Sequence, residues 1–571
     1  MSLKIVIAGG VAAGTSAAAK ARRCDEHAEI VLFEQGSSIS YATCGMPYYL
    51  NGVIKERESL LVVKPDSFAQ RFNIRLCLRH RVEAIHSEEQ EVRVRDLSTN
   101  RTFRERYDRL ILCTGSRAVV PPLPGVELPF VFSLKSLDDM DQIFSFMAEK
   151  SPRRSAVIGG GLIGVEMAEC LRERGLEVTL VEMMEQVLPF LDWDMAQLIQ
   201  AHLDEKGVRL LLGQPLKSIG YGAGGDGEVI IGSGFRVPCD MVILAIGVRP
   251  DVELARRAGV DIGPTGAVSV DDETRTSLPH IFAAGDCAEA MHLITGKTAY
   301  MPMATVANKQ GRAAGANAVG RHLKVQGFCG TVIVKSFEMT AARTGLNQRE
   351  ALREGMDPLV HYIHPGDHAG YYPGSHPLHI KIITCRRTGH LLGAQVVGRK
   401  GVDKRIDVFA AALYNRMKTE DLIHLDLAYA PPYAPARDAV LVAGATGQTL
   451  FSGDWRPILP AELYERIHGN DQLCIVDVRQ PKECREEGII PGAIEIPLPD
   501  LRERIGELDP DRETVVYCRQ GVRAYIATRI MSQRGFRDVK NLTGGVLSWP
   551  YELVKQNRSE PDGDPLKGCE S

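Results

Sequence analysis

Two glycine-rich turns, each between an apolar strand and a helical segment, constrain the fold of this chain more than any other feature. The more regular one, GGGLIG at residues 159–164, follows the apolar run SAVI. Gly159 permits a tight turn, Gly161 lets the backbone approach a pyrophosphate, and Gly164 lets helix and strand pack closely. Because the helix N-terminus then faces the phosphates, the pattern predicts a dinucleotide-binding unit of Rossmann type.

An acidic residue after this turn indicates which nucleotide binds. The strand EVTLVE ends at Glu182, about 20 residues past the glycines, where a carboxylate accepts from ribose hydroxyls and repels a 2′-phosphate. Met183 and Met184 follow, and no arginine is near. We therefore expect NADH rather than NADPH. Glu166, two residues after the last glycine, is expected to face the nicotinamide carboxamide, and the alternative is a solvated helix carboxylate.

The turn near the N-terminus is less regular. Gly9 and Gly14 occupy the first and third glycine positions, and Val11 replaces the middle glycine. Glu34 ends the second strand at the right distance, and Asp286 in AAGDC supplies a late acidic residue for a flavin ribityl chain. Together these residues predict FAD. Two dinucleotide sites in one chain predict a hydride passed from nicotinamide to flavin.

The strand and helix signals divide the chain into nested domains. The strand HIFAAGD belongs with the first unit but follows the second, so the second interrupts the first. The predicted fold class is α/β: two nested Rossmann-like domains, an α+β third domain and a C-terminal α/β domain. The expected boundaries are 1–120 and 250–325 for the FAD domain, 121–249 for the NAD domain, 326–443 for the third domain, 444–459 for a linker with Gly, Pro and Ser, 460–556 for the C-terminal domain, and 557–571 for a polar tail.

Composition excludes several classes of protein. The chain has 571 residues, 44% hydrophobic and 25% charged, as in ordinary soluble proteins of several domains. A formal net charge of -4 gives no reason to expect binding to nucleic acid or an anionic membrane. There is no apolar run of 18 or more residues. Thirteen cysteines without CxxC pairs indicate free thiols, no metal site and a reducing, cytoplasmic location.

One cysteine stands out by its neighbours. The run SYATCGMPYY holds Cys44, with no second cysteine four or five residues away. A single redox cysteine must pair with something that arrives: a small thiol, a sulfur atom or an oxygen atom. Pro47 is expected to begin a helix, whose N-terminus would hold Cys44 as a thiolate beside the flavin. The alternative is a buried, inert cysteine.

This stretch resembles the SxxxCGLPY signature of the coenzyme A-disulfide reductases, a branch of the FAD-dependent pyridine nucleotide–disulfide oxidoreductases. The resemblance covers residues 1 to about 443 and includes HAGYYPG and YAPPYAPARD. It implies a homodimer formed through the third domain. It also implies roles for five further residues: coenzyme A binding by Arg22, Arg23 and Ser40, and contact with the partner subunit's cysteine by Tyr371 and Tyr429.

The C-terminal domain has a signature of its own. IVDVRQPKECREEGIIPGA followed by VVYCRQGVRA resembles a rhodanese domain. The six-residue loop from Cys518 to Arg523 is expected to point its backbone N–H groups inward and to lead into a helix near Ala524. Such a loop stabilises a thiolate or persulfide on Cys518, with positive charge from Arg519 and Arg523, and its length favours sulfur over phosphate. Two residues expected to be structural are Asp477 and Arg479.

The whole chain resembles fusions of coenzyme A-disulfide reductase with rhodanese, the NADH-dependent persulfide reductases. The resemblance implies that NADH, through FAD and Cys44, reduces coenzyme A persulfide, polysulfide or coenzyme A disulfide to hydrosulfide and free thiol. Cys518 would carry sulfane sulfur. Three alternatives stay open: an NADH oxidase or peroxidase that uses a sulfenic acid, a sulfurtransferase with a structural flavoprotein half, and a rhodanese unit that only docks or senses.

Overall fold

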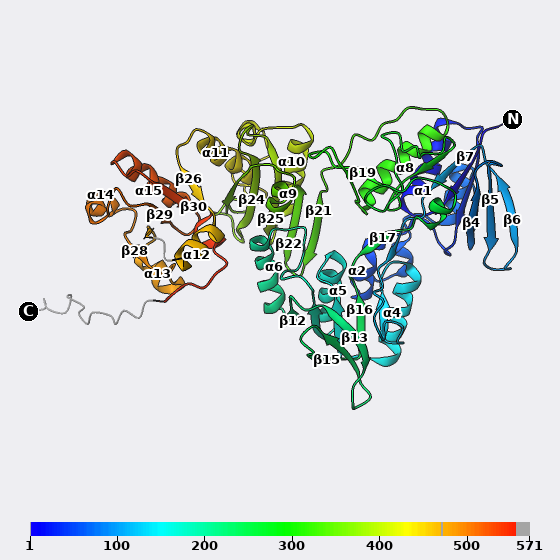
Figure 1. Cartoon of the computed structure of the whole chain (residues 1–571), viewed down its shortest axis with the longest axis horizontal. Coiled ribbons are helices and arrows are strands. Elements are labelled where there is room, and N and C mark those ends of the chain that lie inside the picture. The colour runs from blue at the N-terminus through cyan, green and yellow to red at the C-terminus, as the bar shows by residue number, and fades with distance from the viewer. Residues whose placement is uncertain (1, 470–471, 556–571) are drawn as a thin grey trace, which may run out of the picture. The chain divides into compact units, whose positions relative to one another are not determined.

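The computed structural model describes residues 2–469 and 472–555, and the chain divides into two compact units, residues 1–345 and 346–571. In Figure 1 the first unit runs from blue to green and the second from green to red. The tail predicted at 557–571 lies outside the described residues.

A parallel five-stranded sheet forms the first domain, and its strand order shows the predicted nesting. The strand β1 is apolar on both faces: Ile5 and Ile7 enter one core cluster, while Val6 and Ala8 enter the other. The last strand of the sheet comes from after the second domain and pairs with β7. In order across the sheet, the strands are β18 (Ile281–Ala283), β7 (Arg109–Leu112), β1 (Lys4–Ala8), β2 (Glu29–Glu34) and β3 (Arg75–Leu78).

Two helices distant in sequence pack against each other beside this sheet: α1 (Ala12–Cys24) and α8 (Ala304–Ala318). A Cβ atom at Gly311 or Gly315 of α8 would overlap backbone atoms of α1. These glycines therefore let the two helices approach closely. The remaining elements of this domain are η1 (Thr43–Gly45), α2 (Met46–Leu50), η2 (Arg57–Leu60), α3 (Pro65–Phe72), β4 (His80–His86), β5 (Glu91–Asp96), β6 (Thr102–Arg106), β8 (Ser116–Ala118), β17 (Val248–Pro250), α7 (Glu253–Arg257), β19 (Ala290–Met291) and β20 (Thr298–Ala299).

The second domain repeats the same plan with a second parallel sheet. Its strands, in order, are β12 (Val208–Leu211), β11 (Glu177–Val181), β10 (Arg154–Ile158), β16 (Met241–Leu244) and β9 (Val131–Ser133). Its helices are α4 (Leu137–Lys150), α5 (Leu162–Glu173) and α6 (Trp193–Glu205), and an antiparallel sheet is formed by β13 (Leu216–Tyr221), β14 (Gly227–Ile231) and β15 (Arg236–Cys239). The first unit ends with the antiparallel pair β21 (Val332–Ser336) and β22 (Met339–Gly345).

The second unit begins with an antiparallel meander. Its strands are β23 (Pro358–Ile363), β24 (Leu378–Cys385) and β25 (Leu391–Gly398). The strand β25 is buried along its whole length. Around the meander lie α9 (Gln348–Arg353), α10 (Val402–Tyr414), η3 (Thr419–His424) and α11 (Ala439–Phe451).

A third parallel sheet organises the C-terminal domain. Its order is β26 (Arg456–Ile458), β30 (Val539–Leu542), β29 (Thr514–Tyr517), β27 (Cys474–Asp477) and β28 (Ala493–Glu495). The helices are α12 (Pro460–His468), α13 (Pro481–Glu487), α14 (Leu501–Arg504) and α15 (Val522–Gln533), with short turns η4 (Ile505–Glu507) and η5 (Gly545–Ser548). The predicted fold class is therefore confirmed.

The segment 444–459, predicted to be a linker, has regular structure over most of its length. Residues 444–451 continue α11, and β26 lies within the second half of the segment. Gly444 and Gly447 permit close packing of this helix. A Cβ at Gly444 would overlap the backbone of Ile423, and one at Gly447 would press on Thr419.

The meander and the C-terminal domain of the second unit share buried contacts. The amide of Tyr362 on β23 donates to Thr543 Oγ1 at 2.9 Å. Leu359, Leu450 and Trp455 form one small apolar cluster. None of the described helices is long and apolar enough to cross a membrane.

Candidate active site

One cavity in the first unit brings together the predicted nucleotide residues and Cys44. It has a volume of about 1840 Å³ and is lined by both Rossmann domains. Such a volume exceeds that of an ordinary single-ligand pocket, so it suits two extended ligands. Among the predicted residues that line it are Gly9, Glu34, Cys44, Gly159, Gly161, Glu166, Glu182 and Asp286.

The two glycine turns have the same geometry. Gly9 and Gly159 have φ values of +106° and +108°, and a Cβ on either would clash with a neighbouring carbonyl group. A Cβ on Gly14 or Gly164 would overlap the carbonyl oxygen of the first glycine of its own turn. By contrast, a Cβ on Gly161 would meet no atom within 4 Å. Open space at that position suits a ligand that approaches the backbone.

Two buried carboxylates fix the turns to the ends of the second strands. Glu34 accepts from the amides of Gly10 at 2.6 Å and Gly36 at 2.7 Å. Glu182 accepts from Gly160 at 2.6 Å and Met184 at 2.8 Å. Burial raises the pKa of Glu34, although these amides oppose the effect. Since a carboxylate can accept about four hydrogen bonds, each retains capacity for a ribose.

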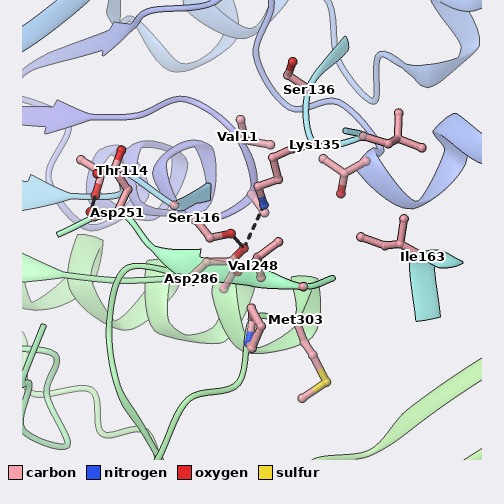
Figure 2. A pocket seen from close by; sticks show the side chains of 18 of the residues that line it. Val11, Thr114, Ser116, Lys135, Ser136, Ile163, Val248, Asp251, Asp286 and Met303 are labelled. Atoms are coloured by element: carbon pink, nitrogen blue, oxygen red, sulfur yellow. Dashed lines mark hydrogen bonds and ion pairs between the residues drawn. The ribbon is translucent and has the colours of Figure 1, made fainter. Parts of the chain in front are cut away.

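Asp286 belongs to a polar cluster beside the first turn. Its carboxylate accepts from Ser116 Oγ at 2.7 Å and from Lys135 Nζ at 3.2 Å (Figure 2). All three residues line the cavity, and Val11 lies near them. The sequence analysis missed Ser116 and Lys135, because neither lies in a recognisable motif.

Glu166 lines the same cavity from α5. Burial, with a smaller effect from the charge of Glu169, raises the pKa of Glu166 to about 7. Glu169 in turn pairs with Lys335. A carboxyl group that titrates near neutrality inside a cleft is a candidate for function. It is not the solvated helix carboxylate of the alternative interpretation.

Cys44 lies in the turn η1, directly before α2, and Pro47 stands in the first turn of α2 as predicted. Among the cysteines of residues 2–469 and 472–555, it is the one classed as exposed. Burial raises the pKa of Cys113 and Cys170, so these two thiols stay protonated and are poor nucleophiles. Burial and the charges of Glu166, Glu169 and Cys44 raise the pKa of Tyr48 to about 12, so this tyrosine, which the sequence analysis missed, keeps its proton.

The residues predicted to bind coenzyme A differ in their exposure and in the partners of their side chains. Arg22 is 5% exposed, and its guanidinium donates to the carbonyl groups of Asp25, Glu26, Phe72 and Asn73. The expectation that Arg22 binds coenzyme A is therefore corrected: its donors are used within the fold. Arg23 is exposed, with its guanidinium 5.9 Å from the Phe72 ring centre, and Ser40 is half-buried.

The loop around Cys518 has the predicted form. It joins β29 to α15, which begins at Val522, two residues earlier than expected, and Gly521 before it has φ +97°. Cys518 is 1% exposed, and its sulfur accepts from the amide of Gly521 at 3.1 Å. Asp477 and Arg479 form a fully buried ion pair, with 2.7 Å between Asp477 Oδ2 and Arg479 Nη2. This contact agrees with the structural roles predicted for them.

Comparison with known proteins assigns the chain to a family. A model described as pyridine nucleotide-disulphide oxidoreductase matches residues 3–311, and the model for the dimerisation domain of the same family matches residues 331–440. The chain belongs to the pyridine nucleotide-disulphide oxidoreductase family. A rhodanese-like domain model matches residues 459–551.

Two solved structures match nearly the whole of this chain. Reduced CoADR-RHD of Bacillus anthracis is 39% identical with a TM-score of 0.92, over 96% of this chain and 98% of that chain. A NAD-dependent persulfide reductase from A. fulgidus is 36% identical with a TM-score of 0.89, over 96% of this chain and 100% of that chain.

Curated relatives match the oxidoreductase part. A coenzyme A disulfide reductase of Staphylococcus haemolyticus is 33% identical over 448 residues, 78% of this chain and 100% of the relative. A relative from Methanocaldococcus jannaschii named NADH oxidase is also 33% identical, over 443 residues, 77% of this chain and 98% of the relative. Membership of the pyridine nucleotide-disulphide oxidoreductase family therefore leaves the final electron acceptor open.

The tyrosines predicted to act across the dimer lie in the dimerisation domain of this oxidoreductase. The hydroxyl groups of Tyr371 and Tyr429 are 2.9 Å apart, and the residues are 75% and 50% exposed. Tyr433 nearby in sequence is also exposed. Exposed aromatic residues are enriched at protein interfaces, so the family's dimerisation domain offers a suitable surface here.

Proposed function

We propose that the protein reduces persulfides and disulfides of coenzyme A, and related polysulfides, with electrons from NADH. The observation that carries this proposal is the exposed Cys44 in one cavity with both dinucleotide turns, in a chain that also holds a complete Cys518 loop. The coenzyme A disulfide and persulfide reductases among the similar proteins support the same substrate class.

The residues of the first turn fit FAD. The pyrophosphate of FAD would lie at the turn, where Gly9 and Gly14 permit close approach to the backbone. Glu34 would accept from the ribose hydroxyls, and the Asp286 cluster would bind the ribityl chain. When bound, FAD would accept hydride from NADH and supply two electrons to sulfur. NADH would be held by the second turn, with Glu182 at its ribose and Glu166 at its carboxamide.

Cys44 carries the sulfur chemistry. As a thiolate, Cys44 attacks the persulfide sulfur that is bonded to the carbon of coenzyme A. The S–S bond of the persulfide breaks and hydrosulfide leaves. Cys44 and coenzyme A are then joined in a mixed disulfide. Two electrons then cleave that disulfide, which releases coenzyme A and restores the thiolate. Overall, NADH, one proton and the persulfide give NAD, hydrogen sulfide and free coenzyme A. Tyr48, whose pKa is raised by burial and by charges that include Cys44, keeps its proton and would serve as a hydrogen-bond donor toward this sulfur.

Coenzyme A recognition and dimer formation complete the proposal. Arg23 and Ser40 would bind the coenzyme, since Arg22 is used within the fold. The protein would act as a homodimer, in which Tyr371 and Tyr429 of the partner subunit reach Cys44 and protonate the leaving sulfur. The match of residues 331–440 to the family's dimerisation domain supports this arrangement.

Cys518 would carry sulfane sulfur to the reductase. The pantetheine arm of coenzyme A would take sulfur from Cys518 and present it to Cys44. Replacing Cys518 with alanine should then spare the reduction of preformed coenzyme A persulfide and slow the use of sulfur that must first be loaded on the loop. Equal loss on both substrates would mean that Cys518 takes part in the reductive step itself.

Anaerobic NADH oxidation tests the proposal. Coenzyme A persulfide, coenzyme A disulfide and polysulfide should each support turnover, and hydrogen sulfide should appear in proportion to NADH consumed with persulfide. Oxygen and hydrogen peroxide serve as the competing acceptors. Turnover with either of them at a higher kcat/KM than with all sulfur compounds would identify an oxidase or peroxidase instead, in line with the name of the M. jannaschii relative.

A further inference from the structure

The helix α13 presents two glutamates to the Cys518 loop. Glu483 and Glu487 are four residues apart, so they lie on one face of the helix. Each forms an ion pair with an arginine of the loop. Glu486 lies off this face, with a side chain 64% exposed and 3.8 Å from Lys482.

Glu483 holds Arg523 in a bidentate pair. Both terminal nitrogens of Arg523 donate to the two oxygens of Glu483 at 2.6 Å. This pairing lowers the pKa of Glu483 to about 2, so the carboxylate stays charged at working pH. Arg523 also interacts with Cys518, which contributes to its raised pKa after Glu483. Glu483 therefore sets the position of the guanidinium that faces the reactive sulfur.

Glu487 engages the other arginine of the loop. Its two oxygens accept from Arg519 Nε and from Arg479, each at 3.0 Å. Arg479 is buried and is shared with Asp477. Around the loop, three arginines are thus matched by three carboxylates. The positive field expected from Arg519 and Arg523 is offset, and the remaining stabilisation of the sulfur comes from backbone amides such as that of Gly521.

Different sulfur donors need different surroundings. Transfer from thiosulfate breaks an S–S bond and releases sulfite, a dianion that free guanidinium groups would stabilise. Transfer from a persulfide or polysulfide breaks the same kind of bond but releases a thiol or thiolate on an organic carrier. At this loop the cations are paired, and Val522 of the loop is 65% exposed, which offers apolar surface to a carrier.

We propose that Glu483 and Glu487 make the Cys518 loop selective for sulfane sulfur carried on a thiol and against small oxyanion donors such as thiosulfate. In the favoured step the Cys518 thiolate attacks the outer sulfur of the persulfide, the thiol leaves with its proton, and Cys518 becomes the persulfide. No oxidant is required. This selectivity rests on the proposed sulfur-carrying role of Cys518 and does not involve the reductase cavity.

Single-turnover loading of Cys518 in the full-length protein tests the selectivity. Glutathione persulfide and thiosulfate are the two donors, and loaded sulfur is measured as thiocyanate after addition of cyanide, with Cys518→Ala as the blank. Wild type should load faster from the persulfide. Glu483→Gln, which keeps the shape but removes the charge, should raise the thiosulfate loading rate by roughly tenfold and change persulfide loading by less than about twofold. Glu486→Gln, on the same helix, should leave both rates unchanged.

Two further measurements separate positioning from folding. The pH dependence of Cys518 alkylation should move to lower pH in Glu483→Gln, since a negative charge near the thiolate is removed, whereas Glu483→Asp should restore the wild-type profile. If Glu483→Gln lowers the melting temperature of the protein, Glu487→Gln provides the same test at the ion pair between Glu487 and Arg519. An unchanged ratio of donor rates in both variants would overturn the selectivity. Loading from neither donor in wild type would overturn the carrier role of Cys518 as well.

Discussion

His364 Nε2 and Ser548 Oγ lie 2.7 Å apart and join the dimerisation domain to the rhodanese domain. Ser548 ends η5, whose Val546 amide donates to the carbonyl oxygen of Cys518 at 2.9 Å. Through η5, these two hydrogen bonds connect a buried histidine of one domain to the Cys518 loop of the other.

This junction should make the second unit sensitive to acid. Burial lowers the pKa of His361 and His379 to about 4, and burial followed by the neighbouring His379 lowers the pKa of His364. The unfolded chain binds these protons near pH 6.5, so stability is complete above pH 6.5 and is lost as pH falls from there toward 4. For His361 and His379, a pKa lowered from 6.5 to about 4 corresponds to a loss on the order of 3 kcal/mol each.

Urea denaturation at pH 8, 6.5 and 5 measures this loss, in a Trp193→Phe background in which the remaining tryptophans, Trp455 and Trp549, both lie in the second unit. His364→Gln should reduce the dependence on pH, and His27→Gln, at an exposed position, should keep it. Equal midpoints at all three pH values in wild type would contradict the assignment.

Replacement of Cys44 by serine should uncouple the two half-reactions. The variant should retain flavin and still oxidise NADH in a single turnover, because neither dinucleotide turn changes. It should lose sulfur-dependent turnover, because serine forms no mixed disulfide. Rapid mixing with NADH and then coenzyme A disulfide follows the flavin absorbance, and Cys385→Ser, at a half-buried cysteine of the other unit, serves as the control. Normal turnover of Cys44→Ser with disulfide would refute its role.

NADH should be preferred over NADPH. A 2′-phosphate beside the Glu182 carboxylate costs about 1 kcal/mol at a solvated distance of about 4 Å, and more where the site is drier. The ratio of kcat/KM for the two cofactors measures this preference. Glu182→Gln should bring the ratio closer to one, while Glu185→Gln, which removes a charge from an exposed neighbour, should leave it unchanged. A higher kcat/KM with NADPH in wild type would show the assignment to be wrong.

Glu166 should impose a pH dependence on the reaction with NADH. Since its pKa is raised to about 7, it is mainly neutral below pH 7 and charged above. The profile of flavin reduction rate against pH should bend near 7 in wild type. Glu166→Gln, which resembles the neutral form, should remove the bend, and Glu173→Gln at the other end of α5 should retain it. A bend that survives in Glu166→Gln must come from another group.

The active site should be completed across the dimer. Mixed dimers of Cys44→Ser subunits with Tyr371→Phe, Tyr429→Phe subunits contain one site with intact cysteine and intact tyrosines if the tyrosines act in trans. Activity above that of both parents is then expected after subunit exchange. Proven mixed dimers without recovery would place the tyrosines in the same site as their own subunit's cysteine, or outside catalysis.

Local motifs accounted for the fold class and much of the site. Glycine turns and strand-end carboxylates predict geometry because backbone contact leaves them little freedom, as at Gly9 and Glu34. Residues whose role depends on long-range packing escaped notice. Lys135 contacts Asp286 only because the nested domains fold together. The sequence does not distinguish Arg22 from Arg23, because their different roles depend on contacts such as that of Arg22 with the end of α3.

The regular structure within residues 444–459 was not evident from composition for a related reason. Glycine indicates flexibility in a chain considered alone, yet Gly444 and Gly447 are sites of contact.

The packing of α11 on η3 has a consequence for how the protein unfolds. A rhodanese domain on a loose tether would melt by itself, but here the helix that leads to it is part of the dimerisation domain, and the two share the cluster of Leu359, Leu450 and Trp455. Heating should therefore melt them in a single calorimetric transition. A truncation near residue 443 would remove part of the core of the dimerisation domain. Gene fusions and truncations should therefore keep the dimerisation and rhodanese domains together as one cooperative folding unit.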